Sequence, residues 1–176
     1  MNRILLVVAL FFSGCITVRN NAGLAEKVVT VRYDKYAHVT NLESASFMTG
    51  SGWYAWFGGA IRDTGQSSMW FRVRAGGHDW KFFDRGIDAD GKRIGIETVK
   101  NKITQFGTAS EDYLVHIDEA YIRSHASTGL DFKLYGSGGS AVVKITPAFI
   151  QGWLARFDAE KERILSIAGN GISGSA

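Results

Sequence analysis

The chain has 176 residues, of which 45% are hydrophobic and 21% charged, and its formal net charge is only +3. The basic residues are scattered along the chain, which argues against a nucleic-acid-binding surface. The length is that of one ordinary domain with a proper core. The 21 Gly residues and the single Pro favour antiparallel strands joined by tight turns.

The first segment is apolar and too short to cross a membrane. Arg3 precedes an unbroken apolar run, Ile4–Phe12, which would span about 14 Å as a helix. A bilayer core needs about 20 residues, so the run is typical of an export signal. Ser13, Gly14 and Cys15 follow, and Cys15 is the only cysteine of the chain. It therefore has no partner for an intramolecular disulfide.

This order of charged start, apolar run, small pair and cysteine resembles the signal peptide of bacterial lipoproteins. The resemblance implies that residues 1–14 are removed and that Cys15 carries a diacylglycerol thioether and acyl chains such as palmitate. Phe12 departs from the motif, in which Leu or a smaller aliphatic residue is usual. Ile16 stands where Asp favours inner-membrane retention, so the resemblance implies export to the periplasm and anchoring at the outer membrane. The alternatives are an ordinary secretory signal with an accidental cysteine and a soluble protein with an apolar start.

The remaining chain divides into a tether, a domain and a tail. Residues 15–26, after the lipidated cysteine, are small and polar and are expected to form a tether. At no more than about 3.6 Å per residue, the tether would keep the domain close to the membrane. We expect a single β-rich domain over residues 27–168 and a disordered tail over 169–176.

Alternating and β-branched segments predict strands over most of the domain. They are residues 28–33, 36–42, 52–61, 67–75, 78–83, 93–99, 112–117, 130–135 and 141–145. Asp90-Gly91 and the glycine-rich segment 136–140 predict hairpin turns. Along 67–75, Met69, Phe71 and Val73 alternate with Trp70, Arg72 and Arg74, whose face we interpret as solvated.

Two helices are expected in the second half of the chain. The shorter covers residues 118–124, with Asp118 as its N-cap. The longer runs from 146 to about 167, with Pro147 at the first helical position. Its apolar stripe consists of Phe149, Ile150, Trp153, Leu154 and Phe157. The sequence therefore predicts an α+β fold, mainly β: an antiparallel sheet or small sandwich of about eight strands, with a C-terminal amphipathic helix packed on it. This order of elements over 28–157 resembles small exported bacterial proteins without an assigned activity, which implies no catalytic residue.

An aromatic cluster is the candidate ligand or partner surface. Trp53, Tyr54, Trp56 and Phe57 lie within five residues of one expected strand, so they face both sides of the sheet. Trp53 and Phe57 share one face, and Tyr54 and Trp56 share the other. One face belongs to the core. The second is covered by the long helix, buried in a partner, or exposed to bind glycans or a membrane interface.

No pattern in the sequence predicts a catalytic residue, a cofactor or a metal site. The four histidines lack the spacing of a zinc site, and the acidic segment at 84–90 does not fit a calcium loop. We therefore expect a non-enzymatic, lipid-anchored envelope protein that binds a protein or a glycan close to the membrane. One alternative is an accessory subunit of an envelope assembly or secretion machine, recruited through an edge strand at 28–33. A second is a hydrolase acting on envelope polymers.

Overall fold

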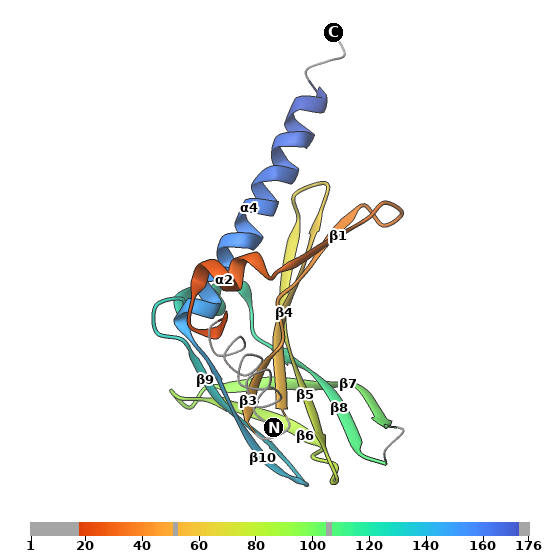
Figure 1. The fold of residues 1–176 in the computed structure, drawn as a ribbon, viewed down its shortest axis with the longest axis vertical. Coiled ribbons are helices and arrows are strands. Elements are labelled where there is room, and N and C mark those ends of the chain that lie inside the picture. The colour runs from red at the N-terminus through yellow and green to blue at the C-terminus, as the bar shows by residue number, and fades with distance from the viewer. Residues whose placement is uncertain (1–17, 51–52, 105–106, 173–176) are drawn as a thin grey trace, which may run out of the picture.

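The computed structural model describes residues 18–50, 53–104 and 107–172, and the expected α+β fold is confirmed. In these residues, ten strands form one antiparallel sheet (Figure 1). The strands are β1 (Thr30–Asp34), β2 (Val39–Glu43), β3 (Phe47–Gly50), β4 (Trp53–Arg62), β5 (Ser67–Gly77), β6 (Phe83–Asp88), β7 (Arg93–Ile103), β8 (Ala109–His116), β9 (Leu130–Gly136) and β10 (Gly139–Ile145). The helices are α2 (Ala22–Lys27), α3 (Glu119–Ser124) and α4 (Pro147–Ile172).

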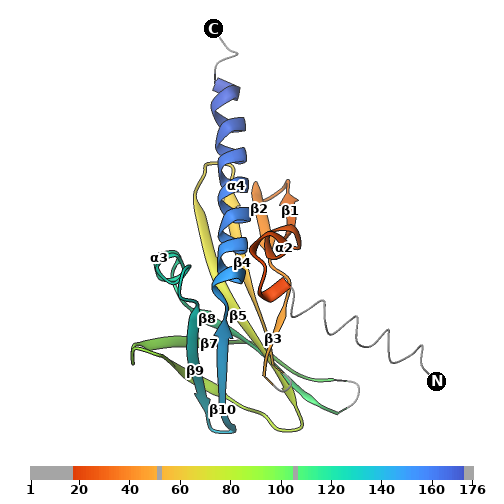
Figure 2. The same ribbon diagram turned by 60° about the vertical axis from the view of Figure 1, so that its left-hand side comes forward.

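The sheet is long and curled. Its strands follow the order β1-β2-β4-β5-β8-β7-β6-β9-β10, and β3 pairs with the remaining part of β4. The curl brings β10 close to β3, and the two views of the ribbon agree on this approach (Figures 1 and 2). The sheet therefore has an enclosed inner face, which holds the core, and an outer face.

Helix α4 fills the inner face with the apolar stripe expected from its sequence. Phe149, Ile150, Trp153 and Phe157 are all at most 1% exposed. The Trp153 ring stacks on Phe57 of β4, with 5.7 Å between ring centroids. These contacts confirm that the helix packs on the sheet, and they set which face of β4 belongs to the core.

The two glycine-containing hairpins form as expected. Gly91 lies in the β6–β7 turn with φ +84°, a conformation that costs glycine little. The Asp88 carboxylate accepts the backbone N–H groups of Asp90 at 3.0 Å and Lys92 at 2.7 Å, and the Tyr121 hydroxyl at 2.6 Å. One carboxylate thus ties the turn to α3. In the second hairpin, β9 and β10 are joined by only two residues.

The prediction of a strand over residues 78–83 is wrong. Strand β5 continues to Gly77, β6 begins at Phe83, and the residues between them form a loop. Glu111, only 1% exposed, accepts the backbone N–H groups of Lys81 at 2.6 Å and Phe82 at 3.0 Å. Its carboxylate thereby holds Phe82 at a positive φ of 49°. A buried carboxylate from a distant strand overrides the aromatic β-propensity of this segment.

Other elements also differ from the expectation. Strand β2 starts at Val39 rather than 36, because the Asp34 carboxylate accepts the N–H groups of Tyr36 and Ala37 and makes a turn. Strand β3 was not expected. Residues 22–26 of the expected tether lie in α2, which packs on α4. Helix α4 continues to Ile172, so residues 169–172 of the expected tail are helical.

Gly152 explains how α2 comes so close to α4. A Cβ built on Gly152 would lie 2.6 Å from the Ala25 Cβ. The absent side chain lets the two helices touch, and Ala25 is 2% exposed in consequence. The part of the expected tether that is described is therefore folded against the domain rather than extended.

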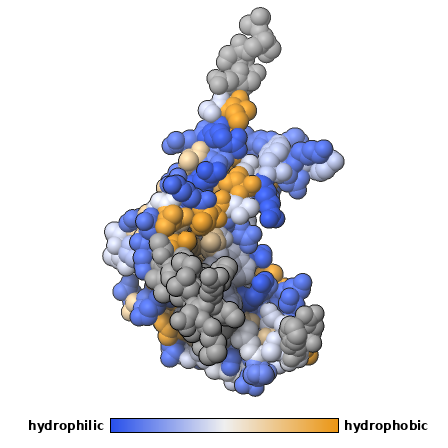
Figure 3. All heavy atoms as spheres, viewed as in Figure 1, coloured by the Kyte–Doolittle hydropathy of each residue, from blue (hydrophilic) through white to orange (hydrophobic). Residues whose placement is uncertain are grey.

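Beyond α2, α4 runs beside the β4–β5 hairpin and extends past it (Figures 1 and 2). Lys161 donates to the Ser67 hydroxyl at 3.0 Å, and the Leu165 side chain lies against Gly65 in the turn. In Figure 3 apolar side chains gather along this helix and its junction with α2. Ile167 is 61% exposed there.

Candidate functional site

The outer face of β4 and β5 carries an unusual set of side chains for a solvated surface. Antiparallel pairing places Trp56 opposite Arg72, and Gly58 opposite Trp70. Because side chains alternate along a strand, these residues share the face that points away from α4. On the neighbouring strand β2, Glu43 lies opposite Gly58. Three strands therefore bring two indoles, a guanidinium and a carboxylate together.

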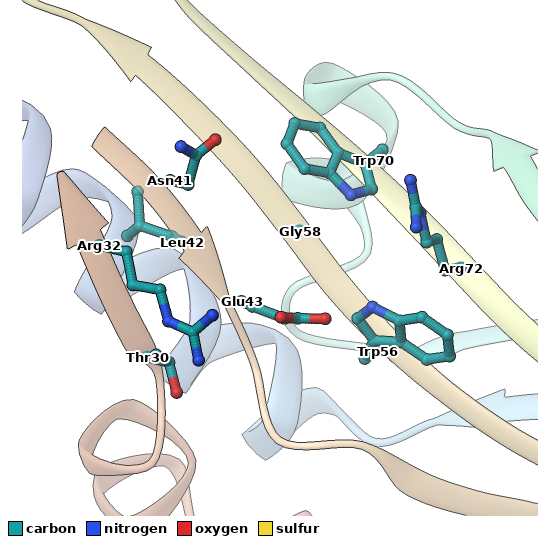
Figure 4. A pocket seen from close by; sticks show the side chains of 9 residues that line it. All are labelled: Thr30, Arg32, Asn41, Leu42, Glu43, Trp56, Gly58, Trp70 and Arg72. Atoms are coloured by element: carbon teal, nitrogen blue, oxygen red, sulfur yellow. The ribbon is translucent and has the colours of Figure 1, made fainter. Parts of the chain in front are cut away.

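These side chains line a pocket of about 330 Å³ (Figure 4). We call it the outer-face pocket. Its lining consists of Thr30, Arg32, Asn41, Leu42, Glu43, Trp56, Gly58, Trp70 and Arg72. In Figure 4 the two indoles lie on either side of Gly58, and the Arg32 guanidinium reaches toward Glu43 from the opposite side.

Gly58 makes room for the indole of Trp70. A Cβ at this position would overlap the indole nitrogen and the adjacent ring carbons of Trp70. Any larger residue would therefore push the ring off the sheet. The glycine lets the pyrrole edge of Trp70 lie on the backbone of β4, where it faces Trp56 (Figure 4).

The pocket contains more hydrogen-bond donors than its own residues satisfy. The Nε atom of Arg72 is buried and has no hydrogen-bond partner. Within the described part of the chain, neither indole N–H of Trp56 or Trp70 has an acceptor, and Arg32 and Arg72 have no ion pair. A buried donor without an acceptor costs about 1–3 kcal/mol, so the pocket is suited to a ligand rich in acceptors.

Arg74, two residues along β5, has a different role. Its guanidinium binds both oxygens of the Asp112 carboxylate, at 2.5 and 2.9 Å, and lies 5.4 Å from the centre of the Trp56 ring. The hydrogen bond from Arg74 to Asp112 raises the pKa of the guanidinium further above its ordinary value. The Arg74 guanidinium therefore has its ion-pair partner within the fold, and it packs against the Trp56 ring.

The four aromatic residues predicted as a candidate surface separate between the two faces. Phe57 is fully buried in the core, and Trp53 is partly buried against Phe83, with 5.2 Å between ring centroids. Tyr54 is 43% exposed on the outer face. Trp56 is only 8% exposed, and its remaining free edge lies in the pocket. Of the four, Trp56 alone lines the outer-face pocket.

Helix α4 does not cover the outer aromatic residues. It packs on the face of Phe57, so the interpretation in which Trp153 and Phe157 cover Tyr54 and Trp56 is wrong. The physical reason is that the sheet curls toward the helix, which leaves the opposite face of β4 to the side chains of β2 and β5.

Sequence reasoning missed most of the pocket. Trp70 and Arg72 were assigned to a solvated face, and Arg32 and Glu43 were not singled out. The signal in the sequence was the alternation of Trp70, Arg72 and Arg74 along one strand. Their pairing with Trp56 and Glu43 depends on strand register, which no short motif reveals.

A second pocket, of about 500 Å³, lies between the end of α4 and the strands β1 and β2. Its charged and phenolic groups have partners within the protein. Tyr33 donates to Asp63 at 2.9 Å, and Arg163 donates to Glu160 at 2.7 Å. The two pockets therefore differ in chemistry, and of the two only the outer-face pocket is lined by a buried donor without an acceptor, the Nε atom of Arg72.

The histidines do not form a metal centre in the described residues, where no group of three or more His, Cys, Asp or Glu could hold an ion. His116 lies 3.4 Å from Glu97. Asp118 instead accepts the Tyr121 N–H at 2.6 Å, which confirms Asp118 as the N-cap of α3. His38 pairs with Asp63 at 3.1 Å on the surface.

Cys15 lies outside the described residues. None of the helices that the structure describes is long and apolar enough to cross a membrane. Comparison with known proteins found no matching family model, no similar curated protein and no similar solved structure. The function must therefore be argued from the chain itself.

Proposed function

We propose that this chain is a non-enzymatic, lipid-anchored envelope protein that binds a glycan in the outer-face pocket. The supporting observation is the pair of indoles, Trp56 and Trp70, whose N–H groups have no acceptor among the described residues. Indole edges and faces suit sugars, because a sugar offers both hydroxyl oxygens and apolar C–H surfaces. The pocket volume of about 330 Å³ lies at the lower end of the usual range for ligand sites.

The pocket also suits binding better than hydrolysis. A glycosidase ordinarily uses two carboxylates flanking the bond that it cleaves. Glu43 is the only carboxylate in the lining of the outer-face pocket, and the lining contains neither Ser nor His. Glu43 is therefore assigned to accept a hydrogen bond from a sugar hydroxyl.

Glycan binding is tested on the purified full chain with neutral and acidic trisaccharides, by titration calorimetry. Trp70→Ala should weaken binding at least tenfold, because the ring is a wall of the pocket. Trp80→Ala is the matched control, since Trp80 is another partly buried tryptophan, in the loop after β5 and outside the pocket lining. Equal loss in both variants, or no binding of any trisaccharide by the native chain, would contradict the proposal.

The anchor is a separate part of the proposal and rests on Cys15. Several acyl chains on one cysteine would hold the domain firmly, since each buried methylene contributes about 0.8 kcal/mol. Cys15→Ser should abolish incorporation of labelled palmitate in a bacterial host and move the chain out of the membrane fraction. Retention in the membrane together with continued labelling would refute the anchor at this residue.

Strand β1 supports a second candidate, the accessory subunit of an envelope machine. Within the described residues β1 pairs only with β2, so one of its edges is open. An open edge can accept a strand from a partner, although Arg32 and Asp34 place charges on it, which discourages indiscriminate pairing. Cross-linking from residue 31 in the native host should capture one specific protein; an absence of specific cross-links would count against this candidate.

A further inference from the structure

We propose that the glycan is acidic and that its carboxylate binds the Arg72 guanidinium. This inference rests on the proposed function, and it adds the charge of the ligand and the residue that recognises it. The lining of the outer-face pocket has more positive than negative charge. Two guanidiniums, of Arg32 and Arg72, line the pocket together with the single carboxylate of Glu43.

Of the two guanidiniums, that of Arg72 is the one beside the indoles (Figure 4). Figure 4 shows the Arg32 guanidinium directed toward Glu43, whereas Arg72 lies on the far side of the pocket beside the two indoles. Within the described chain, Arg72 has no carboxylate within the 4.0 Å that defines an ion pair. Its Nε atom is buried and lacks an acceptor. Arg72 is partly buried, and a buried N–H group without an acceptor is costly, so an anionic ligand would relieve this cost.

Arg74, the neighbouring arginine on β5, has the ion-pair partner that Arg72 lacks. Arg74 has the same alternation, the same face and a tryptophan beside it, but Asp112 on β8 binds it through both oxygens. The residue at the corresponding place for Arg72 is Leu114, which pairs with it across β5 and β8. The fold thus provides a carboxylate for Arg74 and an apolar side chain for Arg72.

The geometry points to a carboxylate on a sugar. A guanidinium binds a carboxylate through two parallel N–H···O bonds, and the adjacent indole N–H groups add donors for ring and hydroxyl oxygens. Glu43, across the pocket, repels a second anion and accepts a hydroxyl instead. A saccharide with one carboxylate at the Arg72 end and neutral hydroxyl groups at the Glu43 end matches the guanidinium, the two indoles and the carboxylate of the pocket. Uronic acids have this chemistry.

The test compares a trisaccharide that carries a single galacturonic acid, at one end, with the methyl ester of the same compound, which has nearly the same shape but no charge. Both are titrated into the purified full chain, alongside inorganic phosphate as a simple anion. The native chain should bind the acid at least tenfold more tightly than the ester, and this preference should weaken as salt rises. Arg72→Ala should remove the preference, so that the acid binds no more tightly than the ester. Arg72→Lys should keep part of it, because Lys keeps the charge but not the two-pronged geometry.

Arg85→Ala is the matched control, because it removes one positive charge from an exposed site on β6, outside the pocket lining. It should keep the full preference for the acid. Equal affinity for acid and ester in the native chain would overturn the acidic-ligand inference and leave glycan binding standing. Failure to bind either compound would overturn both. Phosphate binding as tight as the acid and equally dependent on Arg72 would identify an anion site rather than a saccharide site, and would also overturn the inference.

Discussion

The two faces of β4 and β5 are built from the same alternating strands and yet differ in whether a ligand can reach their side chains. On the inner face, Phe57 and Phe71 are fully buried, their rings contact one another, and Phe57 stacks on Trp153 of α4. On the outer face, Trp56 is 8% exposed and Trp70 is partly buried, and their indole N–H groups lack acceptors within the described chain. The inner face encloses one indole N–H without an acceptor, that of Trp153, whereas the donors of the outer face line a pocket in which a ligand or water can satisfy them.

The largest expected effect comes from the inner face. Trp153→Ala should lower the free energy of unfolding by about 3–5 kcal/mol, because it opens a cavity under Phe57 and Phe157. Chemical denaturation measures the loss. Ile167→Ala, at an exposed position of the same helix, should change stability by less than about 0.5 kcal/mol. Similar effects of the two substitutions would mean that the inner face is not the core.

Gly58→Ala tests the close packing of Trp70 on the backbone of β4, on the outer face. The added methyl group would displace the Trp70 indole, and overpacking of this kind costs about 1–3 kcal/mol. Thermal or denaturant unfolding should detect the loss, and trisaccharide binding should disappear with it. Gly77→Ala is the control on the same sheet, since a Cβ there meets nothing within 4 Å. A stable Gly58→Ala protein with native binding would show that the tight fit of Trp70 is unimportant.

Substitution of the two arginines of β5 should have different effects, with Arg74→Ala lowering stability and Arg72→Ala changing binding. Arg74→Ala leaves the Asp112 carboxylate, which is 8% exposed, without its partner, at a cost of about 1–3 kcal/mol. Arg72→Ala removes no partner and should leave stability within about 0.5 kcal/mol of the native value. Unfolding midpoints of the two variants, measured side by side, provide the comparison. A larger loss for Arg72→Ala than for Arg74→Ala would invalidate the distinction between them.

A smaller effect is expected from Asp88, on a strand that does not contribute to the pocket. The hydrogen bond from Tyr121, followed by those from Lys92 and Asp90, lowers the pKa of this carboxyl group below its ordinary value. A lowered folded-state pKa contributes stability that is present above the unfolded value of about 3.9 and is lost as pH falls through the folded value. Stability should therefore decrease below about pH 4.

The Asp88→Asn protein isolates this contribution. It should be less stable near neutral pH and should lose less stability on acidification than the native chain. Denaturation at a series of pH values provides the measurement. Parallel pH profiles for the two proteins would show that Asp88 does not contribute to the acid sensitivity.

Local patterns in the sequence were sufficient for the elements whose signals are short-range. Asp118 caps α3, Pro147 begins α4, and the residues expected on the inner side of α4 are buried. The Asp90-Gly91 turn joins two strands as expected. Each of these depends on residues within a few positions of one another. The strand expected over 78–83 failed because its conformation is decided by Glu111, a buried residue about thirty positions away.

The sequence by itself determined the fold class, the hairpins and the apolar side of α4, because alternation, capping and helical periodicity are properties of neighbouring residues. It also predicts the lipid anchor at Cys15, which stays a prediction. Only the tertiary structure decided which side of β4 faces α4 and which residues line the outer-face pocket. The register of β2, β4 and β5 places Glu43, Trp56 and Trp70 together, and it depends on how the whole sheet curls around the core. The same register gives Arg74 a carboxylate partner and leaves Arg72 without one.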